Sequence, residues 1–153
     1  MANTYTQIYV QVVFAVQGRQ NFIRPERKEE LQKYITGIVT RHKQKLLAIH
    51  CMPDHTHILT NLKPDIALLD LVRVIKTGST NHINENVWVR GHFAWQEGFG
   101  AFSCAHSQLD AVIHYIQNQG QHHARQDFRA EYAALLDKFH VPHDEQYVFQ
   151  CVE

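Results

Sequence analysis

The segment Leu46–Asn61, LLAIHCMPDHTHILTN, decides the fold, because it holds two strand-forming runs and the turn between them. Leu46–Cys51 is the first apolar run and His57–Asn61 is the second. Pro53 and Asp54 between them are typical turn residues. Strands joined by so short a connection pair in the antiparallel sense. The segment therefore predicts a β-hairpin.

The flanking segments extend the hairpin to a β-α-β-β-α-β order. Gln7–Val16 alternates apolar residues with a period of two, which predicts a long strand. Arg24–His42 and Ile66–Asn84 carry apolar residues at spacings of three and four, which predicts helices. Phe93–Glu97 and Ala101–Cys104 are predicted as short strands on either side of a glycine-containing loop. This order predicts an α+β, ferredoxin-like (RRM-like) antiparallel sheet with helices on one face.

Two more helices are predicted in the C-terminal part of the chain. They run from about Gln108 to His122 and from Asp127 to His140, and an extended tail with Tyr147–Phe149 follows. No repeat, low-complexity stretch or linker interrupts the chain, so residues 1–153 are expected to form a single domain. The residues expected to face the core are Leu31, Tyr34, Ile35, Ile38, Val39, Leu69, Val72, Ile75, Ile83, Leu109, Val112, Ile113 and Ile116.

Composition excludes several classes of protein. The 153 residues include 15 Lys and Arg against 15 Asp and Glu, so the chain is not a polybasic binder. Its three cysteines contain no CxxC pair, which argues against a disulfide scaffold and a cysteine-rich zinc site. No cationic and apolar leader is present at the N-terminus, and no apolar run reaches the roughly 18 residues of a membrane span. We therefore expect a cytoplasmic protein without a membrane segment.

The strongest local motif is the His55-Thr56-His57 triplet after the hairpin turn. Residues two apart in a strand point to the same face, so both imidazoles can reach one metal ion if the strand begins by His55. The alternative is a chance pair, because the chain contains 12 histidines.

A second motif is Tyr115-Ile116-Gln117-Asn118-Gln119. Tyr115 and Gln119 lie four residues apart and would share one side of a helix, beside its apolar stripe. There they could line a cleft, and His122 would join the same side. Alternatively, Tyr115 is a residue at the boundary between core and solvent, and Gln119 is solvated.

Two further features permit contact with nucleic acid. The segment Trp95–Ser103 places two glycines around Phe99, which suits either an exposed loop with aromatic stacking or a hairpin with core aromatics. Arg73 and Lys76, one turn apart on a predicted helix, and Arg90 are candidate phosphate contacts. A solvated helix face is the alternative, and the zero net charge favours it.

Taken together, these motifs resemble the small single-tyrosine transposases of the HUH superfamily, the TnpA type of bacterial and archaeal insertion sequences. The resemblance spans nearly the whole chain and keeps the order of the motifs. It is carried by four segments: Met52–Leu59, Trp95–Ser103, Tyr115–Gln119 with His122 and His123, and the tail Phe139–Tyr147.

The resemblance implies a mechanism and a set of site residues. His55, His57 and Gln119 match the positions that hold a divalent metal, with Mg²⁺ or Mn²⁺ expected, and Tyr115 matches the nucleophile. The family cleaves single-stranded DNA near hairpins at element ends, forms a covalent 5′-phosphotyrosine, frees a 3′-hydroxyl and reverses the step to rejoin strands. It acts as a homodimer in which the tyrosine helix can complete the partner subunit's site.

The sequence departs from the family at two places and leaves other functions open. Asn81-His82 stands where relatives often carry Lys-Trp, and Phe99 replaces a common tyrosine in the glycine loop. One alternative is a domesticated relative that acts on repeated extragenic palindromes, and another is a non-catalytic nucleic-acid-binding module. A zinc hydrolase is a further alternative, although no obvious third zinc ligand lies near His55 and His57 in the sequence.

Overall fold

The computed structural model describes residues 3–120 and 127–143. The strands in these residues form a four-stranded antiparallel sheet in the order β2-β3-β1-β4. The strands are β1 (Tyr9–Ala15), β2 (Lys45–Met52), β3 (His55–Asn61) and β4 (Gly100–Cys104). The predicted hairpin is confirmed, since β2 and β3 pair up to Met52 and His55 on either side of the turn. The third strand begins at His55, two residues before the predicted start.

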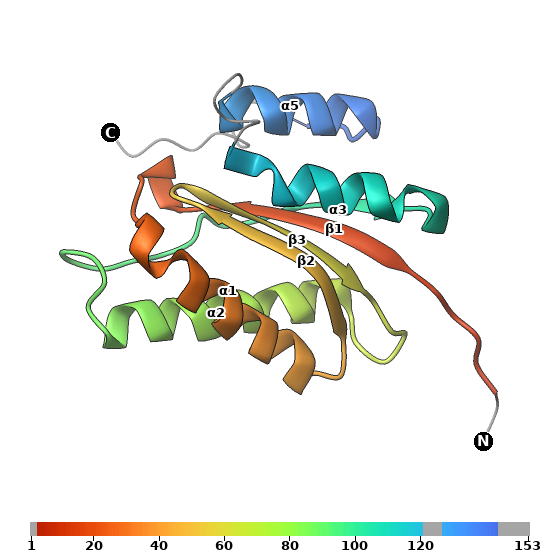
Figure 1. Cartoon of the computed structure of the whole chain (residues 1–153), viewed down its shortest axis with the longest axis horizontal. Coiled ribbons are helices and arrows are strands. Elements are labelled where there is room, and N and C mark those ends of the chain that lie inside the picture. The colour runs from red at the N-terminus through yellow and green to blue at the C-terminus, as the bar shows by residue number, and fades with distance from the viewer. Residues whose placement is uncertain (1–2, 121–126, 144–153) are drawn as a thin grey trace.

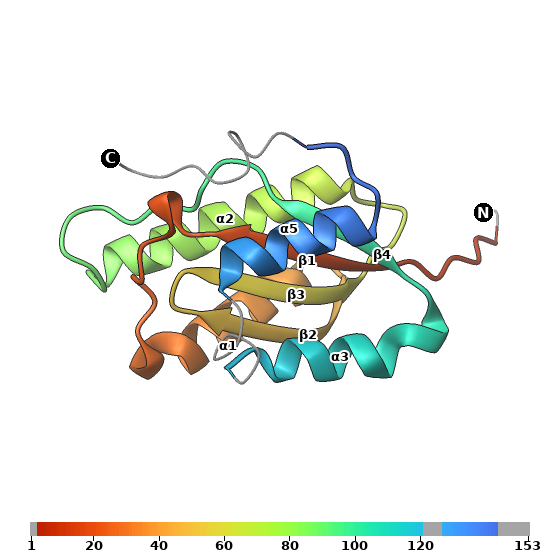
Figure 2. The same cartoon turned by 90° about the horizontal axis from the view of Figure 1, so that it is seen from above.

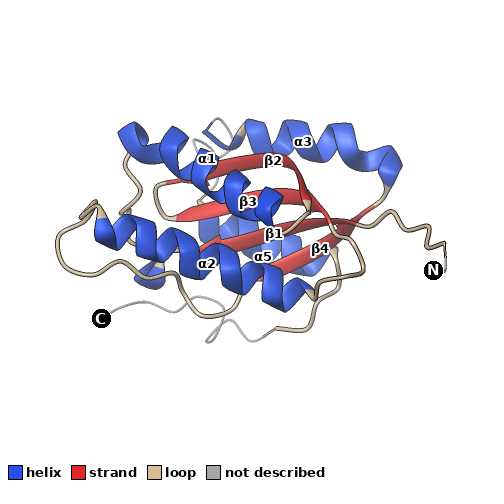
Figure 3. Ribbon diagram, turned by 90° about the horizontal axis from the view of Figure 1, so that it is seen from below, coloured by secondary structure: helices blue, strands red, loops and turns tan. Residues whose placement is uncertain are grey.

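Helices cover both faces of this sheet (Figure 1). The helices in the described residues are α1 (Pro25–Arg41), α2 (Leu68–Glu85), α3 (Leu109–Gln117) and α5 (Phe128–Lys138), with 3-10 turns at Gln17–Arg19 and His106–Gln108. Figures 2 and 3 show the sheet from above and from below, with α3 and α5 over one face and α1 and α2 over the other. The predicted order of strands and helices is confirmed, and the C-terminal helices occupy the face that the first two leave open.

The central strand β1 is buried on both faces because its residues alternate between two cores. Val10, Val12 and Phe14 pack with α1 and α2, whereas Val13 and Ala15 pack with Phe102 and α5. A smaller cluster joins Tyr9, Leu59 and Ile116 beneath α3. The face beneath α3 and α5 is therefore also covered, and the polar side chains of His55 and His57 on it are withdrawn from solvent.

Three predictions of local structure differ from the structure. Phe93–Glu97 is not a strand, and only Trp95 forms a bridge, to Val16. Leu69 is 58% exposed because α2 turns Leu71 and Val72 inward instead. The helix predicted to reach His122 is interrupted at Asn118, where α3 ends. His122, His123 and the tail Tyr147–Phe149 lie outside the described residues.

None of the described helices is both long and apolar enough to cross a membrane. The cores instead bury the inward residues of the amphipathic helices. Of the predicted inward positions, Leu31, Ile35, Ile38, Val39, Val72, Ile75, Ile83 and Ile116 are buried, and Tyr34, Leu109, Val112 and Ile113 are half-buried at the edge of a core.

Candidate active site

The two histidines of the HxH motif lie side by side on the sheet face that α3 and α5 cover. His55 and His57 stand two residues apart in β3, so their side chains leave the strand on the same side. Both are almost fully buried, at 1% and 0% exposure. Their ring centroids are 5.2 Å apart. The strand geometry thus delivers the two imidazoles to one point, as the motif predicts.

Asp54 and Glu131 orient these imidazoles from opposite sides. Asp54 Oδ1 lies 2.6 Å from Nδ1 of His55, which turns Nε2 of that ring toward the interior. There, Oε1 of Glu131 lies 2.9 Å from Nε2 of His57 and 3.8 Å from Nε2 of His55. A carboxylate behind a histidine fixes the ring and its tautomer, which is the usual second partner of a metal-binding imidazole.

Glu131 is the site residue that sequence reasoning missed, because it lies 74 residues beyond His57. It belongs to α5 and is only 2% exposed. The helix brings it to the histidines by packing Phe128, one turn earlier, against the His55 ring at 4.1 Å between centroids. A third candidate ligand is therefore present in space, although it is remote from the two histidines in the sequence.

Tyr115 approaches the same carboxylate from α3. Its hydroxyl donates a hydrogen bond to Oε2 of Glu131, the oxygen that does not face His57. Its ring lies edge-on to His57, with centroids 5.8 Å apart and planes at 88°. Burial raises the pKa of Tyr115 above its usual range, and the hydrogen bond to Glu131 and the charge of that carboxylate act in the same direction. The hydroxyl is therefore protonated at neutral pH.

Gln119 lies beside Tyr115, although the two do not share one continuous helix. The turn at Asn118 separates Gln119 from α3, yet Nε2 of Gln119 still donates to the carbonyl oxygen of Tyr115 at 3.3 Å. The side chain also hydrogen-bonds the Tyr115 hydroxyl, which lowers the pKa of that tyrosine against the larger opposing effects. Gln119 is fully buried. The four site residues predicted from the sequence are thus brought together.

The donor set fits a divalent cation. One imidazole nitrogen each from His55 and His57 and one carboxylate oxygen of Glu131 lie within 4.8 Å of one another, and all three residues are buried. Imidazole and carboxylate ligands suit several divalent first-row metals. A buried glutamate beside two imidazoles is costly without a compensating positive charge. This cluster therefore has the chemistry of a metal site.

The three candidate DNA contacts lie apart from this cluster. Arg73 is exposed on α2 and pairs with Asp70 at 3.3 Å, and Arg90 is exposed beyond the end of that helix. Because α2 packs on the opposite face of the sheet, the structure does not bring Arg73 and the histidines together.

Lys76 is engaged with the glycine loop. Its Nζ donates to the carbonyl oxygens of Gln96, at 2.8 Å, and of Gly98, and it lies 5.7 Å from the Phe14 ring centre. Burial lowers its pKa to about 8. Gly98 has a φ of +82°, a conformation that favours glycine. Lys76 thus fixes the backbone of this loop. Trp95 and Phe102 are buried and Phe99 packs half-buried against the core, so these aromatic residues belong to the core.

Comparison with known proteins assigns the sequence to a family. Residues 4–119 match the model of the family described as "Transposase IS200 like". The ISDra2 transposase TnpA of Deinococcus radiodurans is 21% identical over 120 residues, which are 74% of this chain and 84% of that protein.

Two solved structures share the fold, each with a TM-score of 0.60. One is a transposase candidate from Deinococcus radiodurans R1, 21% identical, with 78% of this chain and 95% of that chain covered. The other is a REP-associated tyrosine transposase bound to a REP hairpin, 16% identical, with 80% and 73% covered. The family match covers well over half of the chain and ends before Glu131, so α5 is placed by the structure alone. The chain belongs to the IS200-like transposase family.

Proposed function

We propose that this protein cleaves and rejoins single-stranded DNA through a covalent 5′-phosphotyrosine at Tyr115. The observation that carries the proposal is the shared carboxylate of Glu131, which contacts the Tyr115 hydroxyl through one oxygen and both histidines through the other. A nucleophile and a metal-type donor set are thereby joined in one buried cluster. This arrangement suits transfer of a phosphoryl group to an amino-acid side chain.

His55, His57 and Glu131 would hold the cation, which we propose to be Mg²⁺ or Mn²⁺, and Gln119 would add a neutral oxygen. Bound there, a divalent cation supplies stabilisation of the negative charge on the phosphate oxygens. The metal-binding role of Gln119 rests on its motif position and on its burial beside Tyr115.

Tyr115 and Glu131, together with water, account for the bonds and protons of the cleavage step. The Tyr115 oxygen attacks phosphorus and the bond from phosphorus to the 3′-oxygen breaks, while the tyrosine proton passes to Oε2 of Glu131 along their hydrogen bond. The leaving 3′-oxygen takes a proton from water. In rejoining, a 3′-hydroxyl attacks the phosphotyrosine and gives up its proton to water. The bond from phosphorus to the Tyr115 oxygen breaks, and Glu131 returns the proton to Tyr115. The phosphodiester energy is retained in the covalent intermediate, so no nucleotide cofactor is needed.

We further propose hairpin-bearing single-stranded DNA as the substrate, a homodimer as the working assembly and a single ferredoxin-like domain as the architecture. The REP hairpin bound to one relative supports the first of these. The β-α-β-β-α-β order and the strand order β2-β3-β1-β4 support the last. Arg73 and Arg90 remain candidate phosphate contacts, on a surface away from the catalytic cluster.

The test is covalent capture of labelled single-stranded DNA from both flanks of the gene, in the presence of Mg²⁺ or Mn²⁺, followed by denaturing electrophoresis. Wild-type protein is expected to give a protein–DNA adduct. Tyr115→Phe should bind the same DNA and give no adduct, because phenylalanine has no nucleophilic oxygen. His55→Ala and His57→Ala should also lose cleavage. An adduct with Tyr115→Phe would assign the nucleophile to another residue.

A domesticated REP-associated enzyme is the second candidate, favoured by the structural similarity to that relative. Its chemistry would be identical, so the neighbouring DNA distinguishes the two. Terminal hairpins that flank the gene indicate a mobile element, and dispersed palindromes without such ends indicate the domesticated form.

A further inference from the structure

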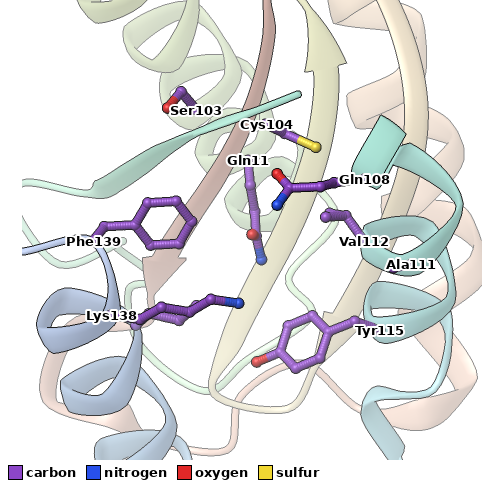
Figure 4. Close-up of a pocket in the computed structure, with 10 residues that line it drawn as sticks. Gln11, Ser103, Cys104, Gln108, Ala111, Val112, Tyr115, Lys138 and Phe139 are labelled. Carbon is purple, nitrogen blue, oxygen red and sulfur yellow. The ribbon is translucent and has the colours of Figure 1, made fainter. Parts of the chain in front are cut away.

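A cavity of about 290 Å³ opens beside Tyr115, between α3, α5 and the sheet (Figure 4). The catalytic cluster does not use this space. Besides Tyr115, its walls include Gln11 of β1, Gln108 before α3, and Lys138 and Phe139 at the end of α5. The lining therefore combines two amides, one cationic side chain, one aromatic ring and the proposed nucleophile.

Within the described residues, Gln11 places a hydrogen-bond donor without an acceptor in the wall of this cavity. The residue is only 5% exposed, and its Nε2 has no hydrogen-bond partner among the described residues. Figure 4 shows its side chain reaching into the space bounded by Gln108, Tyr115 and Lys138. A buried amide N–H without an acceptor is destabilising, so native proteins rarely keep one unless a ligand or water satisfies it.

The sheet register places Gln11 close to the catalytic residues. Val13 of β1 pairs with His57, and Gln11 follows on the same face two residues along, about 7 Å away. Tyr115 belongs both to the cavity wall and to the cluster around Glu131. A group held in the cavity would therefore lie next to the phosphate that Tyr115 attacks.

We propose that this cavity binds one unpaired nucleobase of the single strand, at a nucleotide that flanks the cleaved phosphodiester. Every base offers a ring nitrogen or carbonyl oxygen that can accept from Gln11, and enzymes commonly read an extruded base by such bonds within a pocket. Phe139 provides an aromatic wall, braced by a stacked contact with Phe102 at 4.8 Å. Lys138 provides positive charge for the adjoining phosphate.

This inference rests on the proposed function, since it assigns a base contact to the same strand. It adds that the protein itself, through Gln11, holds the base at one position beside the cut.

The experiment uses the full-length protein and a series of single-stranded oligonucleotides from the gene's flanks, each with one abasic nucleotide moved across the cleavage site. Affinity is measured by fluorescence anisotropy with Tyr115→Phe, so that cleavage does not interfere, and adduct yield is measured with wild-type protein. One abasic position is expected to weaken binding about tenfold, the scale of one stacked or hydrogen-bonded base. In Gln11→Leu, that position should lose most of its effect.

A second pair of variants tests the cavity without touching Gln11. Ala111→Leu places a larger side chain at the cavity wall and should weaken binding of intact DNA while leaving the abasic strand unaffected. Ala130→Leu makes the same change at an exposed site on α5 that does not line the cavity, and should have no effect.

The outcomes separate this inference from the proposed function. If wild-type protein forms the adduct but no abasic position weakens binding, or the penalty persists unchanged in Gln11→Leu, the base pocket is refuted and the transposase chemistry stands. If no strand from either flank forms an adduct with wild-type protein, both are refuted. If Gln11→Leu does not fold, the abasic series and Ala111→Leu decide the question alone.

Discussion

Glu131 joins the two halves of the proposed catalytic cluster through its two carboxylate oxygens. One oxygen faces the histidines of β3 and the other accepts the hydroxyl of Tyr115. A carboxylate that is 2% exposed bears a desolvation cost that these contacts and a cation would offset. The position of this one side chain therefore couples the proposed metal site to the proposed nucleophile, which neither the HxH motif nor the tyrosine motif achieves alone.

Glu131→Gln is expected to weaken Mn²⁺ binding by about 10- to 100-fold, because the amide keeps the size of the side chain and loses its negative charge. Isothermal calorimetry with Mn²⁺ measures this without DNA. The adduct yield should fall as well, since the amide oxygen is a poor proton acceptor. Asp137→Asn removes a charge from the exposed side of the same helix and serves as the control. Equal Mn²⁺ affinity in both variants would exclude Glu131 as a ligand.

His50 makes a separate prediction about pH. It lies in β2 opposite His57, and burial, followed by the positive charge of Lys28, lowers its pKa to about 4 from the ordinary 6.5. The unfolded chain therefore binds a proton on this residue below about pH 6.5, whereas the folded protein does so only near pH 4. The stability associated with neutral His50 is complete above pH 6.5 and is lost as the pH falls toward 4.

The measurement compares urea unfolding of wild type and His50→Gln at pH 7 and pH 5. The wild type should lose about 1 kcal/mol more than the variant between these values, a figure reduced from the full linkage because His50 is only partly buried. The comparison with His50→Gln cancels the contribution of the other histidines. Identical losses in the two proteins would mean that His50 titrates normally in the folded state.

The site was predictable from the sequence where its residues are local to one motif. His55 and His57 share a strand, and Tyr115 and Gln119 lie four apart, so spacing alone suggested that each pair meets. Glu131 comes from a separate helix and is placed by tertiary packing, which spacing does not encode. One signal was present, because Glu131 interrupts the inward stripe of Phe128, Tyr132 and Leu135, where a charged residue requires a partner.

At the scale of elements, α5 is held on the sheet by a close contact at Gly100. A Cβ atom at Gly100 would lie 2.7 Å from Cε2 and 2.8 Å from the hydroxyl oxygen of Tyr132. The absence of a side chain at this position in β4 lets the Tyr132 ring rest on the strand. Glu131 is the preceding residue, so this contact sets the depth at which its carboxylate meets the histidines.

Gly100→Ala is expected to push Tyr132 outward and tilt α5, which lowers stability by about 1–3 kcal/mol as in other overpacked sites. Mn²⁺ affinity should fall with it, because Glu131 moves away from His57. Adding Tyr132→Leu makes room for the new methyl group and should restore part of both quantities. Thermal unfolding and Mn²⁺ calorimetry on the single and double variants provide the measurements. A single variant with unchanged Mn²⁺ affinity would show that this contact does not position Glu131.

Most helices and strands were predicted from the periodicity of apolar residues. The strand predicted over Phe93–Glu97 is an exception with a specific physical cause. Phe93 and Trp95 alternate inward as in a strand, and both are buried. The side chain of Asn84, however, donates from Nδ2 to the Phe93 carbonyl at 3.0 Å and accepts from the Phe93 N–H at 2.8 Å. An amide from α2 thus satisfies the backbone groups that a neighbouring strand would have paired. The strand predicted over Phe93–Glu97 is therefore wrong, although Phe93 and Trp95 are buried.

At the scale of the whole molecule, the sheet has two outer strands of different character. β2 carries an irregularity between Leu46 and Ala48 and has α3 packed beside it. β4 pairs with β1 on one side only and is the last strand of the described sheet. An unpaired strand edge is a ready site for pairing with a second chain. β4 is therefore the edge we expect to meet a partner subunit.

We predict a homodimer in solution in which β4 extends the sheet toward the second copy. Light scattering at micromolar concentration should give twice the 17.8 kDa mass of the chain. Ser103→Lys puts a long charged side chain on β4 at an exposed position and should shift the equilibrium to monomer, because lysine at a strand edge opposes pairing. Ser107→Lys makes the same change outside the strand, in the 3-10 turn, and should remain dimeric. A wild-type protein that stays monomeric would refute the predicted homodimer. A Ser103→Lys variant that stays dimeric would show that the dimer interface does not involve β4.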